Sequence, residues 1–322
     1  MPERRTGRKM LVTGAAGFIG SHLCRALCDA GHAVIAADVP NADWWRHNEL
    51  AISATRIRCD LADVRAVAAL ARRGPFDTVF HLASTVDVRR DKALVGRMLE
   101  TDLRATAHVL TTLAPTARRV VLAGTCEEYG DGSAPFRETQ REVAVSPYAW
   151  AKISATHLGQ LFAKVFDAPV VVVRPFLTYG PLQTGDMLVP AAIRAALAGV
   201  PLKMTRGDQT REFNYVTDIV AGLIAVARAP GVVGQIINLG SGRPTRVAAL
   251  ARLVYKLCSS AAAPKLGAFP HRPGETMRFF SDTRHARRLV RWTPRTTLVD
   301  GLRHTIAWMR GHHSHASTSI RA

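Results

Sequence analysis

Met10-Leu11-Val12-Thr13-Gly14-Ala15-Ala16-Gly17-Phe18-Ile19-Gly20 is the stretch of sequence that decides the fold. Its apolar start predicts a buried strand, its glycines predict a tight turn, and residues 19–30 predict an amphipathic helix. Gly14 permits the turn, Gly17 lets a phosphate approach the backbone, and Gly20 lets the helix pack closely on the strand. A helix that begins here directs unpaired N–H groups and its positive dipole end toward an anion. The stretch therefore predicts a binding site for the diphosphate of a dinucleotide.

Further apolar runs follow this stretch, and helical patterns separate them. Strands are expected at residues 33–37, 56–59, 78–82, 119–123 and 170–173. Helices are expected at residues 64–73, 94–113 and 148–166. Strands that are apolar throughout and alternate with helices form a parallel sheet covered on both faces. The sequence therefore predicts an α/β fold with a doubly wound parallel sheet of the Rossmann type, which binds ligands at the carboxyl ends of its strands.

After residue 180 the alternation gives way to helices at residues 189–197 and 246–258, with short strands and Pro/Gly turns between them. This change predicts a smaller C-terminal substrate lobe. The domain prediction comprises a basic tail at residues 1–8, a dinucleotide-binding domain at 9–180 with contributions from about 211–240, a substrate lobe at 181–210 and 241–310, and a flexible tail at 311–322.

Composition excludes several classes of protein. The 322 residues carry a formal net charge of +18, but the basic residues are scattered, with no aromatic-interleaved stripe and no zinc-finger spacing. We therefore expect a solvated surface and affinity for anionic small molecules, and no nucleic-acid partner. Five cysteines without a CxxC pair argue against a disulfide scaffold and a structural zinc, so no metal is expected. No run approaches the roughly 18 apolar residues of a membrane span, and we expect a cytoplasmic protein.

Two carboxylates and a tyrosine–lysine pair point to redox chemistry. Asp38 ends the second predicted strand, where a carboxylate binds the adenosine ribose and repels a 2′-phosphate, which favours NAD over NADP. Asp60 closes the third strand and is placed to meet the adenine. Tyr148 and Lys152 lie four residues apart on a predicted helix and so share a face. A nearby ammonium favours the phenolate of a tyrosine, which can then take a proton from an alcohol.

With these residues in place, the chain resembles the extended short-chain dehydrogenase/reductases, specifically their NAD-dependent nucleotide-sugar epimerases and dehydratases. The resemblance runs from about residue 9 to residue 310. Besides the residues above, it rests on the following motifs: His81-Leu82-Ala83, residues 125–130, Ser146-Pro147-Tyr148, Arg174-Pro175-Phe176, Tyr179-Gly180-Pro181, Arg211-Glu212-Phe213, Asn238-Leu239-Gly240-Ser241-Gly242 and Arg272-Pro273-Gly274-Glu275.

The resemblance implies a role for each matching residue. Thr125 would hydrogen-bond the reacting sugar hydroxyl, and Lys152 would also hold the nicotinamide ribose. Arg211 and Arg272 would grip the diphosphate of a nucleotide sugar, a use that suits guanidinium groups, and Glu275 would accept hydrogen bonds from the nucleoside ribose. The implied NAD site consists of Gly14, Ala16, Gly17, Phe18, Ile19, Gly20, Asp38, Asp60, Leu61, Leu82, Ala83, Tyr148, Lys152 and Pro175. The implied substrate site consists of Thr85, Thr125, Leu177, Leu188, Arg211, Arg272 and Glu275.

The segment Thr125-Cys126-Glu127 bears on the reaction. Sugar 4,6-dehydratases of this family carry Thr-Asp-Glu or Thr-Ser-Glu here, and a nucleotide-sugar 5,6-dehydratase carries a similar triplet with Cys. In such a reaction, oxidation at C4 acidifies the C5 hydrogen. Glu127 would remove that hydrogen, the neutral Cys126 thiol would protonate the departing C6 hydroxyl, and the hydride would return to C6 or C4. The catalytic set is thus predicted as Thr125, Cys126, Glu127, Tyr148 and Lys152.

Other interpretations of the same residues stay open. Cys126 can pack as a small apolar residue, and Glu127 can serve as a cap or a structural ion pair. A nucleotide-sugar 4-epimerase, a 4-keto-sugar reductase, and a catalytically silent NAD-binding regulator or RNA-binding protein are the alternatives to a dehydratase. The chain also departs from the family where Leu177 and Asp102 replace asparagines. By resemblance, we expect a homodimer formed through the helices at residues 94–113 and 148–166.

Overall fold

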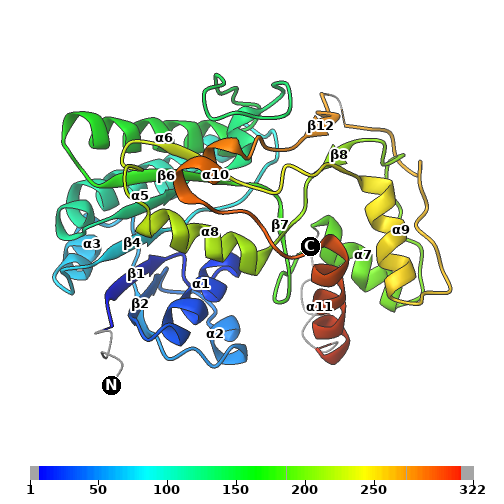
Figure 1. Cartoon of the computed structure of the whole chain (residues 1–322), viewed down its shortest axis with the longest axis horizontal. Helices are drawn as coiled ribbons and strands as arrows, with labels where there is room; N and C mark the ends of the chain where they lie inside the picture. Colours follow the sequence, from blue (N-terminus) through cyan, green and yellow to red (C-terminus); the bar gives the residue numbers. More distant parts are fainter. Residues whose placement is uncertain (1–6, 186, 273, 313–322) are drawn as a thin grey trace.

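The structure is a computed structural model that describes residues 7–185, 187–272 and 274–312. The tails predicted at residues 1–8 and 311–322 lie largely outside these described residues. A parallel sheet flanked by helices forms one side of the molecule, and a smaller lobe with α7, α9 and α11 forms the other (Figure 1). Within the described ranges, no helix combines the length and the apolar character that crossing a membrane requires.

Within the described residues, seven parallel strands form the central sheet, in the order β10-β6-β5-β4-β1-β2-β3. The chain runs outward from β1 to β3, returns to β4, and continues outward to β6 and β10, so the predicted doubly wound fold is confirmed. The strands are β1 (Lys9–Thr13), β2 (Ala33–Asp38), β3 (Thr55–Arg58), β4 (Thr78–His81), β5 (Val120–Ala123), β6 (Val170–Pro175) and β10 (Ile236–Leu239).

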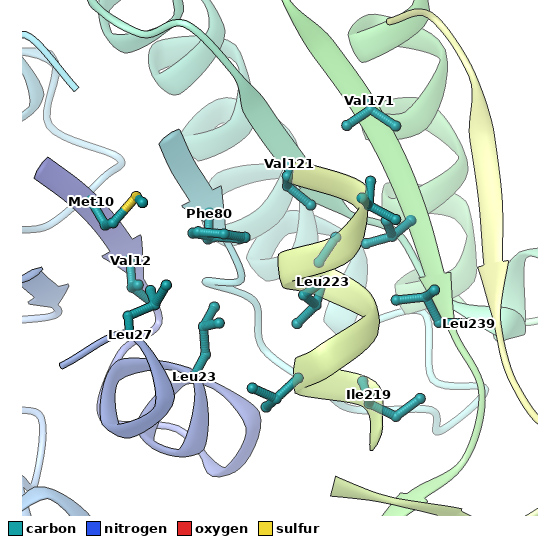
Figure 2. Close-up of a cluster of buried hydrophobic side chains, with 14 of the residues drawn as sticks. Met10, Val12, Leu23, Leu27, Phe80, Val121, Val171, Ile219, Leu223 and Leu239 are labelled. Atoms are coloured by element: carbon teal, nitrogen blue, oxygen red, sulfur yellow. The ribbon is translucent and has the colours of Figure 1, made fainter. Parts of the chain in front are cut away.

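Side chains alternate between two apolar cores, one on each face of the sheet. On β1, Met10 and Val12 enter one core and Leu11 enters the other. Figure 2 shows the first core, where Leu23 of α1 and Leu223 of α8 pack against the strands. Because both faces are covered, the inner strands need no polar side chains along their length, which explains their apolar sequences, whereas the edge strand β3 is mostly exposed and polar.

The predicted helices at residues 19–30, 64–73 and 148–166 are present on the sheet, whereas α2 and α8 were not predicted and residues 94–113 differ from the prediction. This segment is not one regular helix: two stretches within it, η1 and η2, are π-helical. Pro147 opens α6 directly after Ser146, whose hydroxyl accepts a hydrogen bond from the amide of Ala149. The helical segments are α1 (Phe18–Asp29), α2 (Trp45–Glu49), α3 (Val64–Ala71), α4 (Leu94–Met98), η1 (Leu99–Arg104), α5 (Ala105–His108), η2 (Val109–Leu113), η3 (Ala114–Thr116), η4 (Cys126–Tyr129), α6 (Pro147–Val165) and α8 (Val216–Arg228).

The smaller lobe has an apolar core of its own, built where α7, α9 and α11 meet. Ile193, Val254 and Ile306, one from each helix, are buried in it. The strand β10 follows the first part of the lobe and pairs with β6 at the edge of the large sheet. This agrees with the predicted contribution of residues 211–240 to the dinucleotide-binding domain. The domain boundaries themselves remain a prediction. The lobe and its connections contain β7 (Thr178–Tyr179), α7 (Leu188–Leu197), β8 (Thr210–Arg211), β9 (Asn214–Tyr215), β11 (Thr245–Arg246), α9 (Val247–Leu257), β12 (Arg278–Phe279), α10 (Arg284–Val290) and α11 (Leu298–Gly311).

Candidate active site

A cavity of about 670 Å³ lies where the carboxyl ends of the strands meet. The structure brings all fourteen residues of the predicted NAD site to its wall: Gly14, Ala16, Gly17, Phe18, Ile19, Gly20, Asp38, Asp60, Leu61, Leu82, Ala83, Tyr148, Lys152 and Pro175. The five predicted catalytic residues line the same cavity. Residues from seven separate chain segments therefore converge on one site, as the parallel topology requires.

Gly14 and Gly20 of the turn have no room for a side chain. Gly14 has a φ of +68°, and a Cβ there would lie 2.7 Å from the backbone nitrogen of Ala83. A Cβ on Gly20 would lie 2.1 Å from the carbonyl oxygen of Gly14. Asp38 supports the turn, because its carboxylate accepts a 2.8 Å hydrogen bond from the amide of Ala16. A narrow backbone cradle beside a cavity of this size, with a carboxylate at the end of β2, fits a dinucleotide.

The candidate catalytic side chains are buried at one end of this cavity. Tyr148 and Lys152 project from the first turns of α6, and Thr125 follows β5 as the N-cap of η4. Only 5% of Tyr148 and 4% of Lys152 are exposed. The Lys152 ammonium donates a 2.7 Å hydrogen bond to the carbonyl of Ala123 and lies 3.8 Å from the Asp102 carboxylate.

The pKa of Tyr148 lies above its usual value in the structure. Burial is the largest cause, a hydrogen bond with Thr125 opposes it, and the negative charge of Asp102 raises the pKa further. The Lys152 ammonium is engaged by Asp102 and Ala123 in the structure. The predicted lowering of the Tyr148 pKa by Lys152 together with the nicotinamide ring stays a prediction. Asp102 is thus a site residue whose influence the sequence did not reveal, although its departure from the family pattern marked it.

Glu128, rather than Glu127, forms the structural hydrogen bond and ion pair of this segment. The fully buried Glu128 carboxylate accepts a 2.7 Å hydrogen bond from the Thr125 amide, and its other oxygen lies 2.7 Å from Arg174. Arg174 also binds Glu142 at 2.6 Å. The structural role that was open for Glu127 is therefore filled by its neighbour, and the Arg174 pair is a supporting contact that the sequence analysis missed.

Glu127 instead lines the cavity, and its pKa is raised above the usual value by burial, an effect that Arg211 opposes. Burial likewise raises the pKa of the Cys126 thiol far above its usual value, so this thiol is neutral. Cys126 packs with four aromatic residues as well as touching the cavity, so both interpretations of it agree with its position. The segment therefore presents one carboxyl group and one neutral thiol to the cavity, beside Tyr148.

A second cavity of about 590 Å³ adjoins the first and opens onto the smaller lobe. Leu188, Arg211, Arg272 and Glu275 line this cavity, and Thr85 and Thr125 line the first. Leu177 lines both. The residues common to the two cavities are Leu177, Thr178, Gln183 and Met187. The predicted substrate residues therefore divide between two connected spaces, as a long ligand with a sugar at one end and a nucleoside at the other would need.

Arg211 and Glu275 bind each other in the structure. The Arg211 guanidinium forms an ion pair with the Glu275 carboxylate and donates a 2.8 Å hydrogen bond to the carbonyl of Thr276. It also lies over the ring of Phe279, 5.6 Å from the ring centre. The predicted ligand-binding groups are therefore held in place by mutual contacts, which fixes the guanidinium at the wall of the second cavity.

Part of the positive charge gathers far from this site. Arg8, Arg118, Arg119 and Arg228 line a cavity of about 490 Å³ at the amino ends of the strands. The helices α1 and α8 end here, and the negative ends of helix dipoles attract cations. Arg119, for example, donates to the carbonyl of Ala229, the C-cap of α8. Among the described residues, no set of three His, Cys, Asp or Glu side chains is arranged to hold a metal ion.

Comparison with known proteins places the chain in a family. A family model described as the NAD dependent epimerase/dehydratase family matches residues 10–240. The chain belongs to this family of extended short-chain dehydrogenase/reductases, whose members modify nucleotide sugars with NAD. The predictions of the family and of NAD as its cofactor are confirmed.

Individual relatives differ in the reaction they carry out. A UDP-N-acetyl-alpha-D-glucosaminuronate decarboxylase of Bacillus cytotoxicus is 30% identical, over 94% of this chain and 98% of its own length. A dTDP-glucose 4,6-dehydratase of Neisseria meningitidis is 29% identical, over 94% of this chain and 93% of its own. The structure of a UDP-glucuronic acid 4-epimerase from Bacillus cereus, in complex with UDP-glucuronic acid and NAD, superposes with a TM-score of 0.85 at 28% identity and covers 94% of this chain and 99% of that one.

Proposed function

We propose that this protein is an NAD-dependent nucleotide-sugar dehydratase. The observation that carries the proposal is the position of Glu127: a largely buried carboxyl group, with a raised pKa, in the wall of the cavity that also holds Tyr148. A group of this kind suits general acid–base catalysis at neutral pH. A 4-epimerase needs a base for the C4 hydroxyl only, whereas loss of water also needs a base for the C5 hydrogen.

Each residue has a separate task in this proposal. Bound NAD supplies the acceptor and the donor of the sugar hydride. Tyr148 takes the proton of the C4 hydroxyl, and Thr125 holds that hydroxyl in place. Glu127 then removes the C5 hydrogen, which the neighbouring C4 ketone has acidified, and the neutral Cys126 thiol protonates the departing C6 hydroxyl. Arg211, Arg272 and Glu275 bind the nucleotide portion in the second cavity.

The Glu127→Gln variant is expected to lose water elimination by about 10²–10⁴-fold, because an amide cannot accept the C5 proton. Oxidation at C4 should persist in part, since Tyr148 and Thr125 remain. The measurement incubates the holoenzyme with UDP-, dTDP-, CDP- and GDP-sugars and follows the loss of water by mass. The matched control is Glu49→Gln, which removes a carboxylate that pairs with His312 and lines neither cavity.

The same sugar panel separates the dehydratase from the other reactions. Formation of 4-epimers alone would remove Glu127 from the mechanism and identify a 4-epimerase. Loss of carbon dioxide from a UDP-uronate would identify a decarboxylase, the reaction named for one relative. Consumption of added NADPH by a protein that carries no bound NAD would identify a reductase. Salt-dependent binding of arbitrary nucleic acid without any turnover would identify a silent regulator or RNA-binding protein.

We also propose that the protein forms a homodimer through α4, η1 and α6. These elements pack against one another and expose apolar side chains, including Leu161, Val165 and Phe166 at the end of α6. Phe166 is 60% exposed and Val165 57%. Apolar surface of this kind on neighbouring helices is typical of an interface between copies of one chain. Sedimentation equilibrium of the holoenzyme is expected to give twice the mass of the chain, and a monomer at micromolar concentration would contradict the proposal.

A further inference from the structure

Asp102 is a buried carboxylate beside the candidate catalytic lysine, and the proposed reaction gives it no task. It is 1% exposed, and its Oδ1 lies 3.8 Å from Nζ of Lys152. Burying a charge pair costs desolvation free energy that a neutral side chain would avoid. Asp102 also lies in η1, and π-helical turns within helices are frequent at functional sites. The charge at this position therefore calls for a physical explanation.

The contacts of Asp102 fix its carboxylate in one orientation. Oδ2 accepts hydrogen bonds from the Thr101 hydroxyl at 2.9 Å and from the Thr85 amide at 3.4 Å, and Oδ1 accepts one from the Ser84 hydroxyl. Both oxygens thus act as acceptors, as they do in an ionised carboxylate. Ser84 and Thr85 belong to the loop after β4, so Asp102 ties this loop to the helix that carries Lys152.

The backbone of Asp102 is held by a second chain of buried polar groups. Its carbonyl accepts a 2.6 Å hydrogen bond from the Thr106 hydroxyl. The single proton of the Thr106 hydroxyl is used in that bond. Its oxygen is therefore the acceptor of the hydrogen bond from Nε2 of His81, which lies 3.2 Å away. Nδ1 of His81 then accepts from the Thr13 hydroxyl at 2.8 Å. Side chains of β1 and β4 thus anchor the π-helical turn that places Asp102 beside Lys152.

Ser84 connects Asp102 to Tyr148. The Ser84 hydroxyl donates to Asp102 in the structure. Its hydrogen bond with Tyr148 lowers the pKa of Tyr148, because the hydroxyl can donate to the Tyr148 oxygen once that oxygen is ionised. The phenol therefore lies next to a hydroxyl that Asp102 orients, and Lys152, one turn further along α6, carries the ammonium that Asp102 faces. The negative charge of Asp102 also raises the pKa of Tyr148, in addition to the effect of burial.

We propose that Asp102 is a positioning residue whose carboxylate fixes the Lys152 ammonium and the Ser84 hydroxyl beside Tyr148, and thereby sets the pH range in which Tyr148 acts as a base. This inference rests on the proposed role of Tyr148 as the base. The negative charge of Asp102 keeps Tyr148 in its neutral phenol form to a higher pH than a neutral side chain at this position would. An asparagine of the same shape would leave the Lys152 charge unopposed and let the phenol ionise at lower pH.

The other titratable groups around Tyr148 and Lys152 do not carry this effect. Cys126, on η4, is a neutral thiol because burial raises its pKa far above the usual value. His81, at the end of β4, is a neutral imidazole because burial and the Lys152 charge lower its pKa to about 3. Both groups stay uncharged across the neutral range. The Glu127 carboxyl group lines the same cavity, but the main causes of the Tyr148 shift include the charge of Asp102 and not that of Glu127.

The test is a titration of Tyr148 in the Asp102→Asn variant of the holoenzyme. The near-ultraviolet tyrosinate band is followed against pH, and the trace of the Tyr148→Phe protein in the same background is subtracted. The midpoint for Tyr148 is expected to fall by about 1 pH unit relative to the parent protein. The rising limb of kcat against pH should move by the same amount in the same direction. The titration needs no substrate, so it stays informative even if the proposed reaction is wrong.

Two further variants separate charge from structure. Asp102→Glu keeps the charge and should keep the parent midpoint within a few tenths of a unit. Ser84→Ala removes a hydrogen bond that lowers the pKa of Tyr148, so its midpoint should rise. A variant that merely opens the site to water would lower the midpoint in all three proteins. An unchanged midpoint in Asp102→Asn, or an equal fall in Asp102→Glu, would overturn the inference.

Discussion

Replacing Tyr148 with phenylalanine is expected to lower kcat for water elimination by about 10²–10⁴-fold, the range in which a positioned general base contributes. The phenol is the buried acid–base group that forms hydrogen bonds with the hydroxyls of Thr125 and Ser84. Phenylalanine keeps the ring and removes only the phenol oxygen. Every later step needs the C4 ketone, so this loss also abolishes epimerisation or decarboxylation. The measurement is kcat for the nucleotide sugar that the substrate panel identifies, with bound NAD quantified in parallel.

The control for Tyr148→Phe is Tyr255→Phe. The Tyr255 hydroxyl donates to the carbonyl of Val200 and accepts from the amide of Leu202, within the smaller lobe and away from the cavity wall. This variant is expected to keep kcat within about twofold while losing about 1 kcal/mol of stability for its hydrogen bonds. A Tyr148→Phe protein that binds NAD and turns over at the parent rate would disprove an acid–base role for Tyr148.

Replacing Arg174 with methionine is expected to lower the free energy of unfolding by about 3–5 kcal/mol, because it strands the Glu128 carboxylate in the interior. Both side chains are fully buried, and the Arg174 guanidinium also contacts Glu142 and lies over the ring of Tyr129. Glu128 accepts from the Thr125 amide, so its displacement should also lower activity. Urea unfolding of the holoenzyme measures the loss, and the same preparation gives kcat.

The double variant Arg174→Met with Glu128→Gln tests the reason for this loss. A neutral amide needs no counter-charge and can still accept from the Thr125 amide, so the double variant should regain a large part of the stability. If both variants lose the same free energy, the damage comes from packing rather than from an unpaired charge. The surface pair of Arg104 with Glu100 is the matched comparison, and breaking it should cost at most about 0.5 kcal/mol.

The fold could be predicted because its determinants are local. Apolar runs such as Val170-Val171-Val172-Val173 fit only a strand covered on both faces, and Gly14 and Gly20 occupy places where any side chain would collide with backbone. The NAD site followed from the same logic, since parallel strands bring their carboxyl ends to one edge. The predicted cofactor residues therefore gather in one cavity, although their individual contacts with NAD remain a proposal.

The parts that the sequence could not supply depend on contacts between distant segments. Arg174 and Glu128 are 46 residues apart, and only the fold shows that they are partners. Lys152 shares a helix face with Tyr148, but the buried Asp102, which adds to the effect of burial on the pKa of Tyr148, comes from another helical segment. The π-helical turns at residues 99–104 and 109–113 carry no sequence pattern that distinguishes them from an α-helix.

The ion pair between Arg211 and Glu275 has a consequence for molecular discrimination on the proposed binding mode. Free phosphate or pyrophosphate would bind the Arg211 guanidinium and leave the Glu275 carboxylate without a partner. A bare nucleoside would bind the Glu275 carboxylate and leave the Arg211 guanidinium without one. A complete nucleotide offers an anion to one partner and hydroxyls to the other, so it alone compensates both. Fragments of the natural ligand should consequently be weak competitors, and the abundant inorganic anions of a cell should leave the pocket free.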